Sequence, residues 1–132
     1  MSKNSGEALS PKQVEAFLRR AKQAFERQDF INASPKHTSA DFWNLELITH
    51  EDQVKAIGQA LDEIRPEHYC GPNPPNHKSK EPKVKGATML QFVWKSARFN
   101  GKEMCLKVCM ADRERLAVLR IHEAYNPNQY DG

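Results

Sequence analysis

Apolar residues near the N-terminus recur every three or four positions, which is the spacing of an amphipathic helix. The segment follows Ser10-Pro11, which is typical of a helix start because serine caps the first turn and proline fits the first helical position. Gln13 stands three residues after the cap and completes a capping box. We therefore predict a helix over 11–27, whose buried stripe is Val14, Phe17, Leu18, Ala21, Ala24 and Phe25.

A second helical pattern covers residues 50–64 and ends before Pro66, which cannot continue a helix. Its apolar stripe is Val54, Ile57, Leu61 and Ile64. The sequence between the two helices is less regular. Because Pro35 disfavours helical backbone in the residue before it, we expect a short extended piece near 31–38 and then a helical turn or two near 39–45.

The C-terminal half alternates between apolar and polar residues, which indicates half-buried strands. We predict strands over 89–97, 103–110 and 116–122, joined by a hairpin around Asn100-Gly101 and by a polar turn at 112–115. One face of these strands is wholly apolar and is expected to carry both helices. Its members are Leu90, Phe92, Trp94, Met104, Leu106, Val108, Met110, Ala117, Leu119 and Ile121.

The pattern predicts an α+β fold in which two N-terminal helices cover one face of a C-terminal antiparallel sheet of three or more strands. We expect one domain over 11–125, a disordered tail over 1–10 and a loose tail over 126–132, because 132 residues is the usual size of a single domain.

The other sheet face is expected to be open and polar. A two-residue Asn-Gly turn would put its polar residues on opposite sides, whereas a three-residue loop, Phe99 to Gly101, keeps them together and pairs Lys95 with Cys105. The apolar pattern favours the three-residue loop. This face then holds Gln91, Val93, Lys95, Cys105, Lys107, Cys109, Val118, Arg120 and His122, which is either an ordinary solvated face or a functional one.

Charge is uneven along the chain. Residues 67–132 hold eleven lysines and arginines against seven acidic residues, which points either to an anionic partner or to a solvated surface. Residues 71–86 form a proline-rich loop with four lysines, Lys78, Lys80, Lys83 and Lys85. Two interpretations of this loop are equally supported: a basic flap over an anionic ligand, or a surface insertion.

Nothing in the sequence indicates a membrane span or a secretory signal, so we expect a cytoplasmic protein. Three cysteines without such a signal do not suggest a disulfide framework. Cys105 and Cys109 stand ~13 Å apart along one strand and cannot share a zinc ion. A nucleophilic pair of Cys105 with His122 is conceivable, although half-buried structural thiols are commoner.

Four passages of the C-terminal half together resemble the motility quorum-sensing regulator (MqsR) family of bacterial toxins, which have a RelE-like ribonuclease fold. They are the helix exit Arg65 to Pro72, the strand Gln91 to Lys95, the stretch Asn100 to Val108 and the ending Val118 to Ala124. The resemblance covers about residues 31–125 and depends on the order and spacing of the passages, since none of them is specific alone.

The resemblance implies an mRNA-cleaving hydrolase that needs no metal or other cofactor and is neutralised by a cognate antitoxin protein. It implies functional roles for Gln91, Lys107, His122 and Tyr69. The chain differs from the family at two places, with Cys70 where a lysine is common and Cys105 where a tyrosine is common.

Metal-free RNA cleavage requires a general base, a general acid and cations that hold the phosphate. His122 suits acid or base work because histidine titrates near neutral pH. We expect Lys107, Lys95 and Arg120 to hold phosphate, with Gln91 orienting it, and Lys83 and Lys85 to add contacts from the loop. The main hypothesis is an endoribonuclease toxin; the alternatives are a weak or inactive relative that binds RNA or protein, and an unrelated Cys/His hydrolase.

Overall fold

A computed structural model describes residues 9–32, 35–70 and 84–124. Both main helices were predicted correctly. α1 spans Pro11–Glu26 and begins with a complete capping box between Ser10 and Gln13. α3 spans His50–Glu63 and begins after Thr49, whose side-chain oxygen accepts a 3.0 Å hydrogen bond from the Asp52 N–H. The expected apolar stripes of both helices contribute to the core, except for Val54 of α3, which is only half-buried and lies outside it.

The segment between these helices differs from the prediction. β1 is only Phe30–Asn32, and α2 already starts at Pro35 and runs to Asn44. The proline therefore begins a helix, a position at which its missing N–H and fixed φ are tolerated. The loop 71–86 lies outside the described residues except for its last three, and so do the tails 1–8 and 125–132. Leu9 and Ser10, which were assigned to the tail, belong to the fold, since Leu9 packs on the core.

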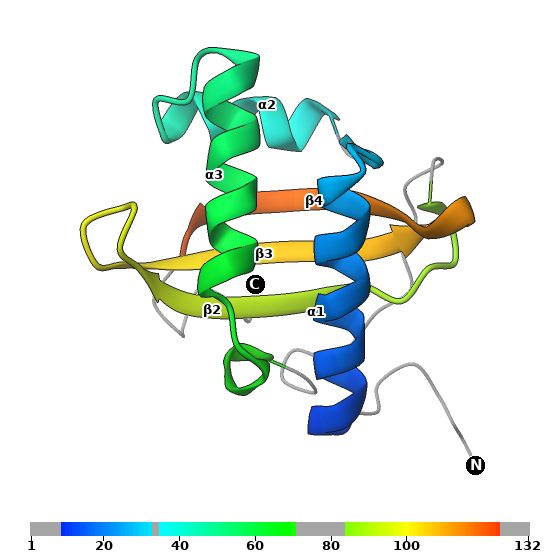
Figure 1. The fold of residues 1–132 in the computed structure, drawn as a ribbon. Coiled ribbons are helices and arrows are strands. Elements are labelled where there is room, and N and C mark those ends of the chain that lie inside the picture. The colour runs from blue at the N-terminus through cyan, green and yellow to red at the C-terminus, as the bar shows by residue number, and fades with distance from the viewer. Residues whose placement is uncertain (1–8, 33–34, 71–83, 125–132) are drawn as a thin grey trace.

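Four strands form one mixed sheet in the order β1-β4-β3-β2 (Figure 1). β2 (Leu90–Ser96), β3 (Lys102–Ala111) and β4 (Arg115–Glu123) are antiparallel, as predicted, and β1 adds to β4 in parallel. α1 and α3 both cross the same face of the sheet (Figure 1). Within the described residues, no helix is long and apolar enough to cross a lipid bilayer.

The β2–β3 hairpin has a longer loop than expected. Ser96 pairs with Lys102, so Ala97 to Gly101 form the turn, in which Asn100 and Gly101 have φ of 60° and 79°. The loop still has an odd number of residues, and the predicted faces are therefore kept. The pairing moves by two residues, so that Lys95 lies opposite Glu103 and not opposite Cys105.

Because of a β-bulge, part of β4 places its side chains on the faces opposite to those predicted. Lys107 pairs with Arg120 but Val108 pairs with Val118, so β4 has one extra residue at this point. As a result Val118, expected on the open face, is fully buried in the helix-side core. Ala117 and Leu119, expected under the helices, lie on the opposite face, in a second apolar cluster that also includes Val84, Cys109 and Ala111. This end of the expected polar face is therefore buried.

Glu63, at the end of α3, links this helix to the β2–β3 hairpin through hydrogen bonds. Its carboxylate accepts hydrogen bonds from Trp94 Nε1 at 2.8 Å and from Ser96 Oγ at 2.7 Å, and it receives further bonds from the Arg98 N–H and the Gln59 amide. Burial by itself raises the pKa of this carboxyl, but the four hydrogen bonds outweigh burial and lower the pKa below its ordinary value of 4.5.

Glu63 should therefore make the protein sensitive to acid. A carboxyl whose pKa is lower in the folded state stabilises the fold fully above its unfolded pKa, near 4.5, and loses that contribution as the pH falls through the folded value. Urea unfolding of wild type and Glu63→Gln between pH 3 and pH 7 tests this. We expect the variant to be less stable at pH 7 and to lose less stability on acidification. Parallel curves for the two proteins would contradict this role.

Candidate functional site

Three strands contribute the polar part of the face that lies away from α1 and α3. Gln91, Lys107 and Arg120 stand directly opposite one another across β2, β3 and β4. The next row on the same face is Val93, Cys105 and His122. Directly paired residues have Cβ atoms about 4.5–5.5 Å apart. The register therefore brings four of the predicted site residues, Gln91, Lys107, Arg120 and His122, into one patch, which we call the sheet-face site.

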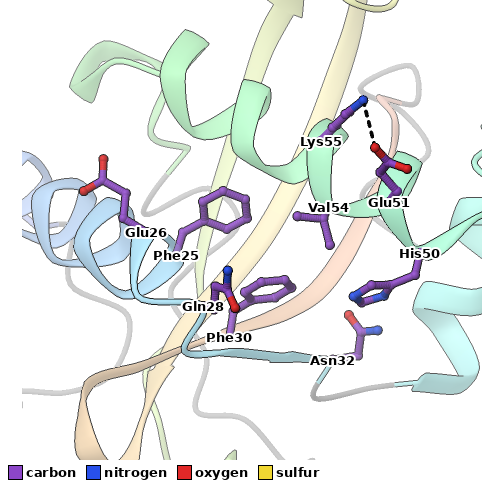
Figure 2. Close-up of a pocket in the computed structure, with 9 residues that line it drawn as sticks. All are labelled: Phe25, Glu26, Gln28, Phe30, Asn32, His50, Glu51, Val54 and Lys55. Atoms are coloured by element: carbon purple, nitrogen blue, oxygen red, sulfur yellow. Dashed lines mark ion pairs between the residues drawn. The ribbon is translucent and has the colours of Figure 1, made fainter.

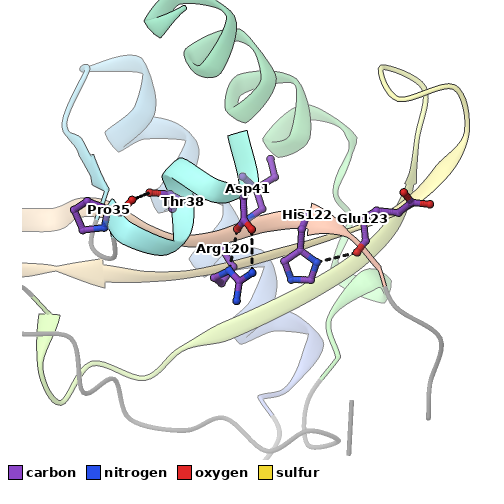
Figure 3. A network of polar contacts seen from close by, with 7 residues as sticks. Pro35, Thr38, Asp41, Arg120, His122 and Glu123 are labelled. Atoms are coloured by element: carbon purple, nitrogen blue, oxygen red, sulfur yellow. Dashed lines mark hydrogen bonds and ion pairs between the residues drawn. The ribbon is translucent and has the colours of Figure 1, made fainter. Parts of the chain in front are cut away.

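Asp41, which was not predicted from the sequence, binds Arg120 of this site. Asp41 lies on α2, which packs along β4, and its carboxylate accepts two bonds of 2.9 Å from Nε and Nη2 of Arg120 (Figure 3). The same carboxylate accepts the backbone N–H of Ile121 at 3.0 Å. The Asp41 side chain is only 3% exposed, whereas the Arg120 side chain is 32% exposed. The ion pair thus has a buried acid and a basic end that reaches the surface.

His122 is oriented by the backbone next to it. Its Nδ1 lies 2.8 Å from the carbonyl oxygen of Glu123 (Figure 3). Since a carbonyl oxygen only accepts, Nδ1 carries the hydrogen, and in the neutral ring the lone pair is on Nε2. This is the tautomer in which Nε2 can take up a proton, so the imidazole is set up for general-base chemistry.

Burial raises the pKa of two thiols, Cys105 in the second row of the site and Cys70 at the edge of β2. Cys105 is 2% exposed, and burial raises its pKa to about 12, with smaller effects from Cys70, Lys107, Arg120 and Asp41. Burial also raises the pKa of Cys70, whose backbone N–H donates to the Gln91 carbonyl at β2. A thiol in this state is a poor nucleophile at neutral pH. Burial of the Cys105 thiol therefore disfavours the hypothesis that the protein is a Cys/His hydrolase.

Tyr69 lies on the wrong side of the sheet for the role expected of it. It pairs with Phe92 through an isolated antiparallel bridge, and the two rings lie 6.1 Å apart on the helix side. Its hydroxyl accepts the Leu9 N–H at 3.2 Å. Because Phe92 and Gln91 point to opposite faces, the Tyr69 ring is separated from the sheet-face site by the sheet itself.

The other described lysines predicted to bind phosphate do not lie in the two rows of the sheet-face site. Lys95 is exposed on the same face but lies opposite Glu103, one row beyond His122. Lys85 is exposed in the turn before β2, and Lys83 lies outside the described residues. The structure therefore brings Lys107 and Arg120 together, with Lys95 at the margin.

The comparisons with known proteins add no relative from which a role could be transferred. No family model, no curated protein and no solved structure matches the chain. Within residues 9–32, 35–70 and 84–124, no three or more histidine, cysteine or acidic side chains gather as they would around a metal ion.

Proposed function

We propose that the chain is a metal-independent endoribonuclease that acts as the toxin of a bacterial toxin–antitoxin pair, related to the RelE-like MqsR family. The observation that carries the proposal is the patch itself: the imidazole of His122, whose Nδ1 contacts the Glu123 carbonyl, lies one row away from Lys107 and Arg120. In this proposal the substrate is mRNA, the partner is an antitoxin protein, and the site of action is the cytoplasm.

In the proposed reaction, His122 Nε2 takes the proton from a ribose 2′-hydroxyl. The 2′-oxygen then bonds to the adjacent phosphorus, and the bond from phosphorus to the 5′-oxygen breaks. The Lys107 ammonium offsets the charge that develops on the phosphoryl oxygens and protonates the leaving 5′-oxygen. Gln91, opposite Lys107, orients the phosphate through its amide. The products are a 2′,3′-cyclic phosphate and a 5′-hydroxyl.

The direct test uses the purified full chain on single-stranded RNA in the presence of EDTA. We expect cleavage that EDTA does not slow, with 2′,3′-cyclic phosphate and 5′-hydroxyl ends on the fragments. Expression without a partner protein should arrest bacterial growth. Products with 5′-phosphates, or activity that returns only when a divalent metal is added, would contradict the proposed chemistry.

A second candidate function is binding without cleavage. Asp41 already neutralises one of the two central cations, and thiols occupy the two positions where the family commonly has lysine and tyrosine. These features favour a relative that binds RNA or protein through the same face. Tight RNA binding with no cleavage under the conditions above would replace the first proposal with this one.

The basic loop gives a separate prediction about RNA binding. If Lys78, Lys80, Lys83 and Lys85 bind phosphates, replacing all four with alanine should weaken binding and lower the slope of log affinity against log salt, by roughly 0.7 for each phosphate that the variant no longer neutralises. A matched control removes the same charge from the helices, as Lys12, Arg19, Lys22 and Lys36→Ala. Equal slopes for the two quadruple variants would identify the loop as a surface insertion.

A further inference from the structure

Outside the sheet-face site, the structure has a pocket on the helix side of the sheet. This pocket of about 790 Å³ opens between the end of α1, the strand β1 and the start of α3 (Figure 2). This volume is within the ~300–1,000 Å³ range of small-molecule sites. Its lining includes Phe25, Gln28, Phe30, Asn32, His50 and Val54. None of them belongs to the sheet-face site.

The apolar part of the pocket is aromatic. The rings of Phe25 and Phe30 lie 5.2 Å apart with an angle of 31° between their planes, and both are half-buried. Phe25 can take this position because Gly58 has no side chain; a Cβ there would come within 2.8 Å of the Phe25 ring. Half-buried aromatic rings of this kind offer area against which a flat apolar or aromatic group can pack.

The polar part of the pocket consists of groups that both donate and accept hydrogen bonds. Gln28 follows α1 in a left-handed turn with φ of 63°, and Asn32 ends β1. His50 opens α3, and its ring and the Asn32 amide point toward one another (Figure 2). Side-chain amides match the donor and acceptor edge of adenine, to which asparagine and glutamine bind with two hydrogen bonds.

Charge around the pocket disfavours an anion. Glu26 and Glu51 carry negative charge, and Lys55, the lysine among the described lining residues, is paired with Glu51 at 3.3 Å. A phosphate or carboxylate placed here would meet more acid than base. The combination of aromatic rings, amides and a slightly acidic rim favours a ligand that is flat, rich in hydrogen-bonding groups and free of negative charge.

We propose that this pocket binds a neutral nucleobase, adenine in preference to uracil. The base could belong to a free nucleoside or to an unpaired nucleotide of an RNA strand, whose phosphates would stay outside the rim. The proposal does not depend on ribonuclease activity. His122→Ala should leave base binding unchanged, so failure of the catalytic proposal and failure of this one can be told apart.

The test is a titration of the ¹⁵N-labelled full chain with adenosine, uridine, adenosine monophosphate and a single-stranded adenine-containing RNA, followed by NMR. We expect adenosine to shift the signals of Asn32, His50 and Val54, to bind more tightly than uridine and to bind at least as tightly as its monophosphate. RNA that binds more tightly than adenosine through the same residues would identify the strand as the source of the base; equal affinities would identify the free nucleoside.

Two variants complete the test. Gly58→Ala should push the Phe25 ring into the pocket and weaken adenosine binding at least ~10-fold, whereas Asp62→Ala, at an exposed position on the same helix, should not. Asn32→Ala at the exposed rim removes one amide without filling the space and should reduce the preference for adenosine over uridine. The proposal fails if no nucleoside binds, if the monophosphate binds much more tightly than adenosine, or if neither Gly58→Ala nor Asn32→Ala changes binding.

Discussion

Replacing His122 with alanine should lower RNA cleavage by ~10²–10⁴-fold, which is the usual contribution of a general acid or base. The variant keeps Lys107 and Arg120, so RNA binding should weaken much less than cleavage. The His122 ring is half-buried and makes its 2.8 Å bond at the strand end, and we expect the fold to tolerate its loss. The measurements are single-turnover cleavage and RNA affinity, made on the same preparations.

His37→Ala is the matched control for this experiment. His37 is exposed on α2 and belongs to neither row of the sheet-face site, so its loss should leave cleavage unchanged. Lys107→Ala should reduce both binding and rate, because in the proposed reaction its ammonium contacts the phosphate in the ground state and in the transition state. If His122→Ala cuts RNA as fast as wild type, the imidazole is not the proton acceptor and the proposed chemistry is wrong.

Replacing Asp41 with alanine should destabilise the protein by about 2–4 kcal/mol. Breaking a fully buried ion pair costs ~3–5 kcal/mol. We expect a smaller loss here because the Arg120 side chain is about one-third exposed and solvent weakens the pair. The substitution also removes the acceptor of the Ile121 N–H. Urea unfolding at neutral pH, with the midpoint and the denaturant dependence fitted together, measures the change.

Two further variants separate the parts of this loss. Asp41→Asn keeps an oxygen that can accept from Ile121 but loses the charge, so its stability should lie between those of wild type and Asp41→Ala. Lys102→Ala breaks an exposed pair of 3.9 Å with Glu123 and should leave the unfolding free energy nearly unchanged. An Asp41→Ala protein as stable as Lys102→Ala would mean that the ion pair does not hold α2 against β4.

The sequence predicted the helices and most strand faces because each has a strong local signal. Ser10 and Thr49 cap the two main helices, and the alternation in β2 and β3 leaves one choice for the buried face. β4 lacks such a signal, because Leu116 to Leu119 is a continuous apolar run. Alternation cannot show which members of such a run face the helices, and a bulge inside it is invisible in the sequence.

The candidate site was predicted only as far as it lies on single strands. Gln91, Lys107 and His122 share a face because of their positions within the strands, and pairing then places them together. Asp41 was missed because it is 79 residues from Arg120 and nothing in its own segment indicates the partner. The pocket was missed for the same reason, since three separate segments bring Phe25, Phe30 and His50 together.

The position of Asp41 also affects how molecules of this protein meet one another. Among the described residues, β1 pairs with β4 as far as Val118, and further along β4 the helix α2 packs against the strand while Asp41 accepts the Ile121 N–H. At the opposite border of the sheet, Cys70 donates to Gln91. Unpaired backbone groups along a sheet border recruit strands from other molecules and lead to aggregation. The Asp41 carboxylate and the bridge of Tyr69 and Cys70 to β2 therefore cover part of each border. We expect this cover to oppose pairing of sheets between molecules, a protection that Asp41→Ala would weaken during concentration or storage.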